Sequence, residues 1–140
     1  MTLVCSMLFV KHFARMREFY GNLLQAQPIN TEWRDRWAFF EAGGAGLALH
    51  AIPEEYAEKV ELSIPAPKRE KSPVKLIFAV DDVRAERARL EGMGITVLPQ
   101  SWQDPAESCD CVDPEGNIFQ IAARGRLPQL FGRNEATRAS

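Results

Sequence analysis

The chain has 140 residues, of which 46% are hydrophobic and 26% charged, and its formal net charge is −2. This composition fits one compact globular domain and excludes a disordered or fibrous chain. Acidic and basic residues nearly balance, so no broad positive field is present to hold a nucleic-acid backbone. No stretch approaches the roughly 20 apolar residues that cross a bilayer. We therefore expect a soluble, cytoplasmic protein that binds neither nucleic acid nor a membrane.

Residues 3–53 predict a strand, a helix and a hairpin in that order. Residues 3–10 are apolar with β-branched and aromatic members, which predicts a strand buried on both faces. Residues 14–24 carry apolar side chains at helical spacing. Strands are then expected at 36–42 and 47–52, joined by the tight turn Gly43-Gly44-Ala45-Gly46.

Residues 54–73 are charged and contain several prolines, which is typical of an exposed connection. One helical turn is expected at 54–59 and a short strand at 60–64. We place the boundary between two halves of the chain in this linker.

The second half predicts a strand at 74–80, followed by a helix over 83–93. Asp81 or Asp82 is the expected N-cap of this helix, and Gly94 its C-cap. Three further strands are expected, at 95–98, 108–112 and 118–122. Residues 124–140 are basic with little periodicity and form a C-terminal tail.

The three cysteines are odd in number. Cys109 and Cys111 are separated by one residue, so on a strand both side chains face the same side, too cramped for an ordinary disulfide. We expect Cys5, Cys109 and Cys111 to be reduced thiols.

The two halves repeat one pattern. Leu8-Phe9-Val10 runs into the first helix, and Phe78-Ala79-Val80 runs into the second, half a chain length later. Repetition on this scale indicates two similar supersecondary units. We predict an α+β fold of two strand–helix–strand–strand–strand units, over about 1–53 and 74–123.

Three local motifs carry a resemblance to a known superfamily. They are Phe19-Tyr20-Gly21-Asn22-Leu23-Leu24, Val80-Asp81-Asp82-Val83 and Asp113-Pro114-Glu115-Gly116-Asn117-Ile118-Phe119-Gln120. With the repeat, they make residues 3–123 similar to the vicinal oxygen chelate superfamily, which includes glyoxalase I, extradiol dioxygenases, bleomycin resistance proteins and fosfomycin-modifying enzymes. Taken alone, residues 113–117 are also a structural turn cassette, because proline presets one dihedral and Gly and Asn tolerate positive φ.

The resemblance implies one domain over residues 1–123. Its two units would form a curved mixed sheet around a cup, with the helices on the convex side. Members of the superfamily commonly pair their units within or between chains, so a homodimer is expected.

The resemblance also implies four positions for the metal ligands that the metal-dependent members carry. These positions hold Cys5, Ala48, Lys75 and Gln120. A methyl group offers no lone pair and an ammonium repels a cation, so this is a poor ligand set for a divalent metal. We expect no metal and no other cofactor. One alternative stays open, in which His50 binds a metal with Cys5 and Gln120.

Without a metal, the expected cup is an apolar pocket with a few polar groups, which is the usual form of a small-molecule site. Lys75 would need an acidic ligand group or an internal partner such as Glu41, unless it bends to solvent along its own stem. The residues expected to line the cup and bind a ligand are Cys5, Met7, Phe9, Trp37, Phe39, His50, Lys75, Ile77, Trp102 and Gln120.

Three functions are compatible with these features. The first is a metal-independent protein similar to bleomycin resistance proteins, which sequesters an aromatic or amphipathic small molecule. The second is a lyase or dioxygenase of the superfamily with an unusual active-site shell, in which Lys75 or His50 acts as acid or base; no catalytic residue can be assigned for it. The third is a dimeric interaction module whose cup is vestigial.

Overall fold

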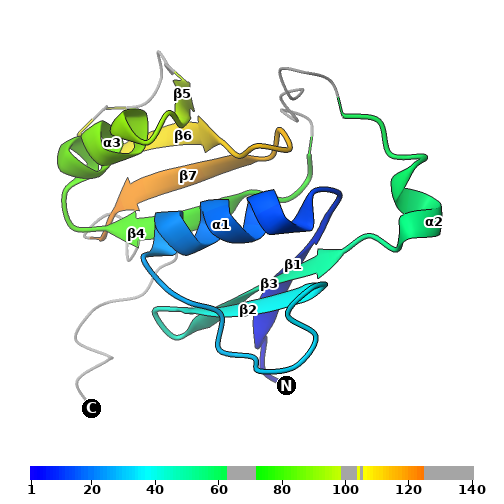
Figure 1. Ribbon diagram of the computed structural model, residues 1–140. Helices are drawn as coiled ribbons and strands as arrows, with labels where there is room; N and C mark the ends of the chain where they lie inside the picture. The colour runs from blue at the N-terminus through cyan, green and yellow to red at the C-terminus, as the bar shows by residue number, and fades with distance from the viewer. Residues whose placement is uncertain (63–71, 99–103, 105, 125–140) are drawn as a thin grey trace. The chain divides into compact units, whose positions relative to one another are not determined.

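The computed structural model describes residues 1–62, 72–98, 104 and 106–124. Contacts divide the chain into two units, Met1–Pro67 and Lys68–Ser140. The first unit contains, in order, β1 (Cys5–Val10), α1 (Phe13–Leu24), β2 (Trp37–Ala42), β3 (Ala45–Ala51) and α2 (Glu54–Ala57). The second contains β4 (Leu76–Val80), α3 (Val83–Gly92), β5 (Thr96–Leu98), β6 (Ser108–Val112) and β7 (Ile118–Ala123). The predicted α+β class is confirmed, with one mixed sheet of three strands and one of four (Figure 1).

In the first unit the strand order is β1-β3-β2, with β1 parallel and β2 antiparallel to β3. The helix α1 packs on one face of this sheet, against β2 and β3. Successive side chains of a strand alternate between faces, so every second residue meets the helix. The side chains buried in this layer include Val10, Met16, Tyr20, Leu23, Ala38, Phe40, Leu47 and Leu49.

The turn of the first hairpin is shorter than predicted. Gly43 and Gly44 alone connect β2 to β3, both with positive φ, at 63° and 87°. Two-residue hairpin loops with positive φ at both positions match the twist of the flanking strands and favour glycine. Ala45 and Gly46, which were expected in the turn, belong to β3 instead.

The helix α1 agrees with its prediction to within one residue. His12 is at the N-cap position, but its side chain makes no capping hydrogen bond. At the other end Gln25 adopts a left-handed conformation with φ 50°, and the chain turns back so that Ala26 N donates to Gly21 O at 3.0 Å. This reversal ends the helix before Pro28.

In the second unit the strand order is β4-β7-β6-β5, with β4 parallel to β7 and the other pairs antiparallel. The helix α3 packs on one face of this sheet (Figure 1). Asp82 is its N-cap, as predicted, and accepts a hydrogen bond from Ala85 N at 3.0 Å. The C-cap is Met93 rather than the predicted Gly94, which follows it with φ 80°, the conformation that glycine favours just after a helix.

Several other boundaries differ from the sequence-based prediction. The strand β4 begins at Leu76 rather than at residue 74, and β5 at Thr96 rather than at residue 95. In the linker, α2 is shorter than the expected turn over 54–59. Residues 60–62 form no strand, and the rest of the strand predicted at 60–64 lies outside the described residues. No helix in the described part of the chain has the length and hydropathy that a bilayer crossing requires.

The turn before β7 is held by Asp113, whose side chain is buried. One carboxylate oxygen, Oδ1, accepts from the backbone N–H groups of Glu115 and Asn117, both at 2.9 Å. The other, Oδ2, accepts from the Asn117 side-chain amide at 2.8 Å. Gly116 has φ 85°, as a turn of this kind requires. The structural explanation of this motif is therefore confirmed.

Cys5, Cys109 and Cys111 are free thiols, as predicted. Cys109 and Cys111 are buried on the face of β6 that meets α3, where Arg87 and Glu91 lie near Cys109. A hydrogen bond from Cys111 lowers the pKa of Cys109. The same hydrogen bond, together with burial, raises the pKa of Cys111.

Candidate functional site

The face of the first sheet that is turned away from α1 is a three-by-three grid of side chains. Strand pairing sets the rows, each with one residue from β1, β3 and β2 in that order. The rows are Phe9, His50 and Trp37; Met7, Ala48 and Phe39; and Cys5, Gly46 and Glu41. We call these nine positions the open face of the first unit. They include all six residues of this unit that were expected to line a cup.

All three residues in the first row of the open face have aromatic rings. The rings of Phe9 and His50 have centroids 5.6 Å apart, and those of Trp37 and His50 are 5.8 Å apart. Phe9 is 63% exposed and Met7 is 41% exposed. The prediction that β1 is buried on both faces is therefore wrong, because only the face toward α1 is covered within this unit. The exposed face offers apolar rings to a partner molecule.

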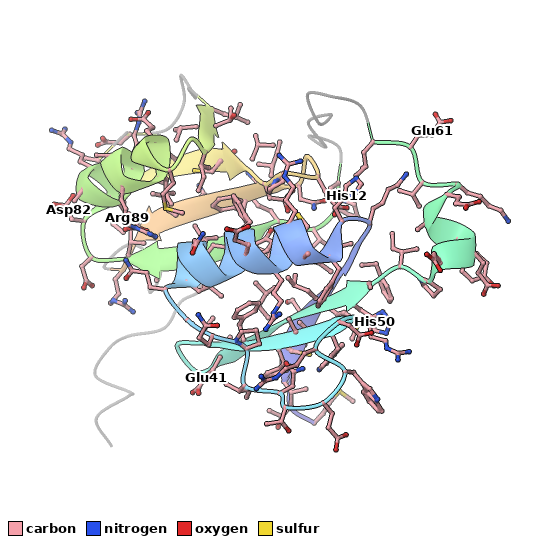
Figure 2. The ribbon with its side chains drawn as sticks, viewed as in Figure 1. His12, Glu41, His50, Glu61, Asp82 and Arg89 are labelled. Carbon is pink, nitrogen blue, oxygen red and sulfur yellow. The ribbon has the colours of Figure 1, made fainter. Side chains whose placement is uncertain are left out.

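The imidazole of His50 has a defined orientation in this row. Its Nδ1 lies 2.7 Å from the carbonyl oxygen of Ala51, and a carbonyl can only accept. Nδ1 therefore carries the proton, which leaves Nε2 of the neutral ring as an acceptor. Figure 2 shows His50 and Glu41 at opposite ends of the β2–β3 hairpin. The open face thus has an acceptor nitrogen at its aromatic end and a carboxylate at the other.

The middle of the open face is closely packed. Phe39 leans over Gly46, so a Cβ added at Gly46 would lie 2.6 Å from Phe39 Cζ and 2.8 Å from the Cys5 Cβ. Ala48, in the neighbouring row, is fully buried. Small residues on β3 therefore let the larger side chains of β1 and β2 settle over the central strand.

The second sheet also has a face turned away from its helix, and a charged pair lies on it. Lys75 Nζ is 2.9 Å from Asp110 Oδ2. The lysine side chain is 38% exposed, whereas that of the aspartate is 3% exposed. Gln120 lies directly between Ile77 and Asp110 in the register of β4, β7 and β6. The expected cup residues Lys75, Ile77 and Gln120 thus share one face with a buried carboxylate.

Asp110 is the residue that the sequence-based prediction missed. Glu41 was one possible internal partner of Lys75, but the structure pairs Lys75 with Asp110 instead. Strand alternation could have indicated this residue. Asp110 lies between Cys109 and Cys111, whose side chains face α3, so the Asp110 side chain faces away from α3. Pairing of β6 with β7 then places it beside Gln120.

The positions that the resemblance assigns to metal ligands do not suit a divalent cation. In the first unit, Cys5 offers a thiol and Ala48 only a methyl group. In the second, Lys75 contributes an ammonium that is already paired with Asp110, and Gln120 an amide. Among the described residues, no three His, Cys, Asp or Glu side chains gather closely enough to hold a metal ion. Carboxylate and imidazole ligands are what Zn, Fe, Mn and Ni sites require.

Of the two tryptophans other than Trp37, the structure describes only Trp33. Trp102, an expected cup residue, lies outside the described residues. Trp33 lies in the connection from α1 to β2, is 66% exposed and has φ 53°. A non-glycine residue in this region of φ is uncommon and carries strain.

The sequence profile of the glyoxalase-like domain family matches residues 3–122. The fold is similar to that of the fosfomycin resistance protein FosX from Listeria monocytogenes, with a TM-score of 0.66 and 19% identity over 95% of this chain and 98% of that one. Glyoxalase I from Leishmania major, described as trypanothione-dependent, gives a TM-score of 0.69 and 13% identity, with coverage of 99% and 98%. Lactoylglutathione lyase from Agrobacterium tumefaciens gives 0.60 and 19%, with coverage of 88% and 93%. A comparison with curated protein sequences found no significant match.

Proposed function

The chain belongs to the family of glyoxalase-like domains, and from that premise we propose that it is a metal-independent protein that binds an aromatic or amphipathic small molecule. The observation that carries the proposal is the row of Phe9, His50 and Trp37 on the open face of the first unit. A flat ligand would stack on exposed rings there. Its hydrogen-bond donor would meet the acceptor nitrogen of His50.

Metal independence is supported by the chemistry of the side chains. Lys75 provides a cationic group at a position where the metal-dependent members of the superfamily would hold a ligand, and Asp110 balances its charge. An ammonium offers no lone pair to a metal, and its pairing with Asp110 engages a carboxylate that could otherwise bind one. We propose that Lys75 and Gln120 serve the ligand as polar contacts, and that no step depends on a metal.

The test is a binding screen with the full chain dialysed against EDTA. The probes are bleomycin, 1-naphthoic acid and S-hexylglutathione, read by thermal shift and then by quenching of tryptophan fluorescence. A ligand that binds the native state alone raises the melting temperature by mass action. We expect at least one probe to shift it, with the same affinity before and after addition of Mn²⁺, Ni²⁺ or Zn²⁺.

Variants locate the site. Phe9→Ala should weaken binding about 3- to 10-fold, since an aromatic stack contributes about 0.5–1.5 kcal/mol. Tyr56→Ala is the matched control, because Tyr56 is a 55% exposed aromatic residue of α2, outside the open face. Equal loss in both variants would contradict a site on the open face.

Two other outcomes would replace the proposal. Stoichiometric metal in protein purified without chelator, with turnover of a hemithioacetal or a catechol, would make the chain a lyase or dioxygenase. If no probe shifts the melting temperature of the wild-type chain, and if Lys75→Ala does not change the response to any probe, the interaction module is favoured. The homodimer remains a prediction, and sedimentation velocity measures it directly.

A further inference from the structure

A hollow lies in the first unit, between α1 and the segment that follows it. Its volume is about 370 Å³, within the range of roughly 300–1,000 Å³ typical of small-molecule pockets. One wall is the stripe of α1 that runs from Phe13 to Asn22, and the other is formed by Ala26–Pro28 with Arg34. We call it the helix pocket. None of its lining residues belongs to the open face.

The reversal of the chain after α1 creates this pocket. Gln25 adopts its left-handed conformation, and Ala26 N then bonds to Gly21 O, which folds the chain back along the helix. A Cβ at Gly21 would lie 3.4 Å from Ala26 O, so glycine allows this close approach. The lining is mixed, and Phe13 and Pro28 are among its apolar residues.

Two guanidinium groups border the helix pocket. Arg17 comes from α1, and Arg34 from the connection to β2. Within the described part of the chain, neither forms a salt bridge. A guanidinium presents several donors in a fixed plane, which suits carboxylate and phosphate groups. Glu18 is the one carboxylate of the lining, so the two arginines leave the pocket with an excess of one positive charge.

The segment that carries Arg34 is held in place by hydrogen bonds. Arg34 Nε donates to Asn30 O at 3.2 Å, which leaves its two terminal nitrogens for a ligand. Trp33 O accepts from both Arg36 N at 3.0 Å and Trp37 N at 2.8 Å, and this turn keeps Trp33 at its positive φ. The strain of that conformation is thus retained next to the pocket wall.

From these features we propose that the helix pocket binds a small organic anion, a carboxylate or phosphate carried on a short apolar or aromatic body. The anionic group lies between Arg17 and Arg34, and the apolar body lies on Phe13 and Pro28. This site is separate from the one on the open face and does not depend on it.

The experiment uses the full chain labelled with ¹⁵N, titrated with phenyl phosphate and with benzoate. Benzyl alcohol tests the need for charge, and inorganic phosphate tests the need for an apolar body. We expect saturable shifts of backbone resonances between Phe13 and Arg34, with millimolar or tighter affinity that falls as salt rises. Benzyl alcohol and inorganic phosphate should each bind at least tenfold more weakly than phenyl phosphate.

Charge variants of the pocket should change the affinity for phenyl phosphate in opposite directions. Arg17→Gln and Arg34→Gln should each weaken phenyl phosphate binding about tenfold, as expected for a charge-assisted hydrogen bond. Glu18→Gln should strengthen it about twofold to fivefold, because it removes the opposing charge. Arg36→Gln is the matched control in the same segment, since Arg36 lies outside the pocket and is exposed beside Asp35.

The proposal is overturned if phenyl phosphate causes no saturable shifts. It is also overturned if the shifts lie elsewhere, or if Arg36→Gln weakens binding as much as Arg17→Gln does. Phe9→Ala separates this site from the one on the open face, because it should leave phenyl phosphate binding unchanged.

Discussion

Lys75 Nζ lies 2.9 Å from Asp110 Oδ2, and the two partners differ sharply in their exposure to water. The aspartate side chain is almost wholly buried, whereas the lysine remains partly solvated. Removing one partner of a buried pair leaves an uncompensated charge, which costs about 3–5 kcal/mol when burial is complete. Since water reaches the lysine, we expect Lys75→Met to lower the free energy of unfolding by about 1–3 kcal/mol.

The cause of that loss can be separated from lost packing by a second substitution. If the Asp110 carboxylate that loses this ammonium is responsible, Lys75→Met with Asp110→Asn should be more stable than Lys75→Met alone, as measured by urea unfolding. A coupling of about 0.5–3 kcal/mol is typical of residues in contact. Arg124→Gln is the control, because its pair with Asp81 is largely exposed and worth about 0–1 kcal/mol. Strictly additive losses would refute the explanation.

Two glycines should respond to alanine with opposite signs. Gly46→Ala places a Cβ within 3 Å of three atoms of Phe39, Cys5 and Val4, and such overpacking costs about 1–3 kcal/mol. Gly92 ends α3 and has nothing within 4 Å of an added Cβ. Gly92→Ala should therefore raise the free energy of unfolding by up to about 1 kcal/mol through helix propensity. Thermal unfolding of both variants checks this, and a stable Gly46→Ala protein would show that Phe39 can move away freely.

The turn before β7 should depend on the carboxylate of Asp113. Asp113→Ala removes the two oxygens that accept three hydrogen bonds and leaves the N–H groups of Glu115 and Asn117 without these partners. Buried groups left unsatisfied cost about 1–3 kcal/mol each, so we expect a loss of about 2–4 kcal/mol. Asp35→Ala, at an exposed aspartate, should change stability by less than about 0.5 kcal/mol. Comparable losses in the two variants, measured in urea, would contradict this role.

The buried thiol of Cys111 should make the fold sensitive to alkaline pH. Its pKa in the folded state is raised above the ordinary value of 9.0, so the folded chain keeps this proton while the unfolded chain releases it. Above pH 9 the unfolded state therefore binds fewer protons, and stability falls by up to about 1.4 kcal/mol per pH unit. The neighbouring Cys109, whose pKa is lowered, opposes this slope until the unfolded chain has also released its Cys109 proton, about one pH unit above 9.

Urea unfolding of the wild-type chain and of Cys111→Ala at pH 9, 9.5 and 10 measures this slope. The difference between the two proteins should shrink as pH rises, while titrating groups other than Cys109, which loses its hydrogen bond in the variant, cancel. Parallel curves would mean that Cys111 ionises in the folded protein as easily as in the unfolded one.

The order of elements could be read from the sequence because it depends on local periodicity. Alternation along β1 correctly groups Cys5, Met7 and Phe9, since the period of a strand is intrinsic to its backbone. Both faces of β1 are apolar, so its own sequence does not show which face is covered. Coverage depends on the elements that pack against the strand. The exposure of Phe9 therefore could not be predicted from its own segment.

Errors at the hairpin and at Lys75 have the same origin in long-range pairing. Four small residues after Ala42 were all suitable for a turn, and only the register with β1 and β2 assigns Gly46 to the strand. The partner of Lys75 is fixed by the packing of β4, β7 and β6, which brings together residues far apart in the chain. The sequence identified Lys75 as a charge in need of a partner, but not Asp110 as that partner.

Asn30 has a further consequence for the first sheet. At the outer side of β2, its side chain accepts from Phe39 N at 2.9 Å and donates to Trp37 O at 3.0 Å, while Ile29 N donates to Phe39 O at 2.8 Å. On the β2 edge of this sheet, the backbone groups of Trp37 and Phe39 that would pair with an incoming strand are thus already hydrogen-bonded. Asn30 and Ile29 together therefore leave less of the β2 edge open to strand addition and self-templated aggregation.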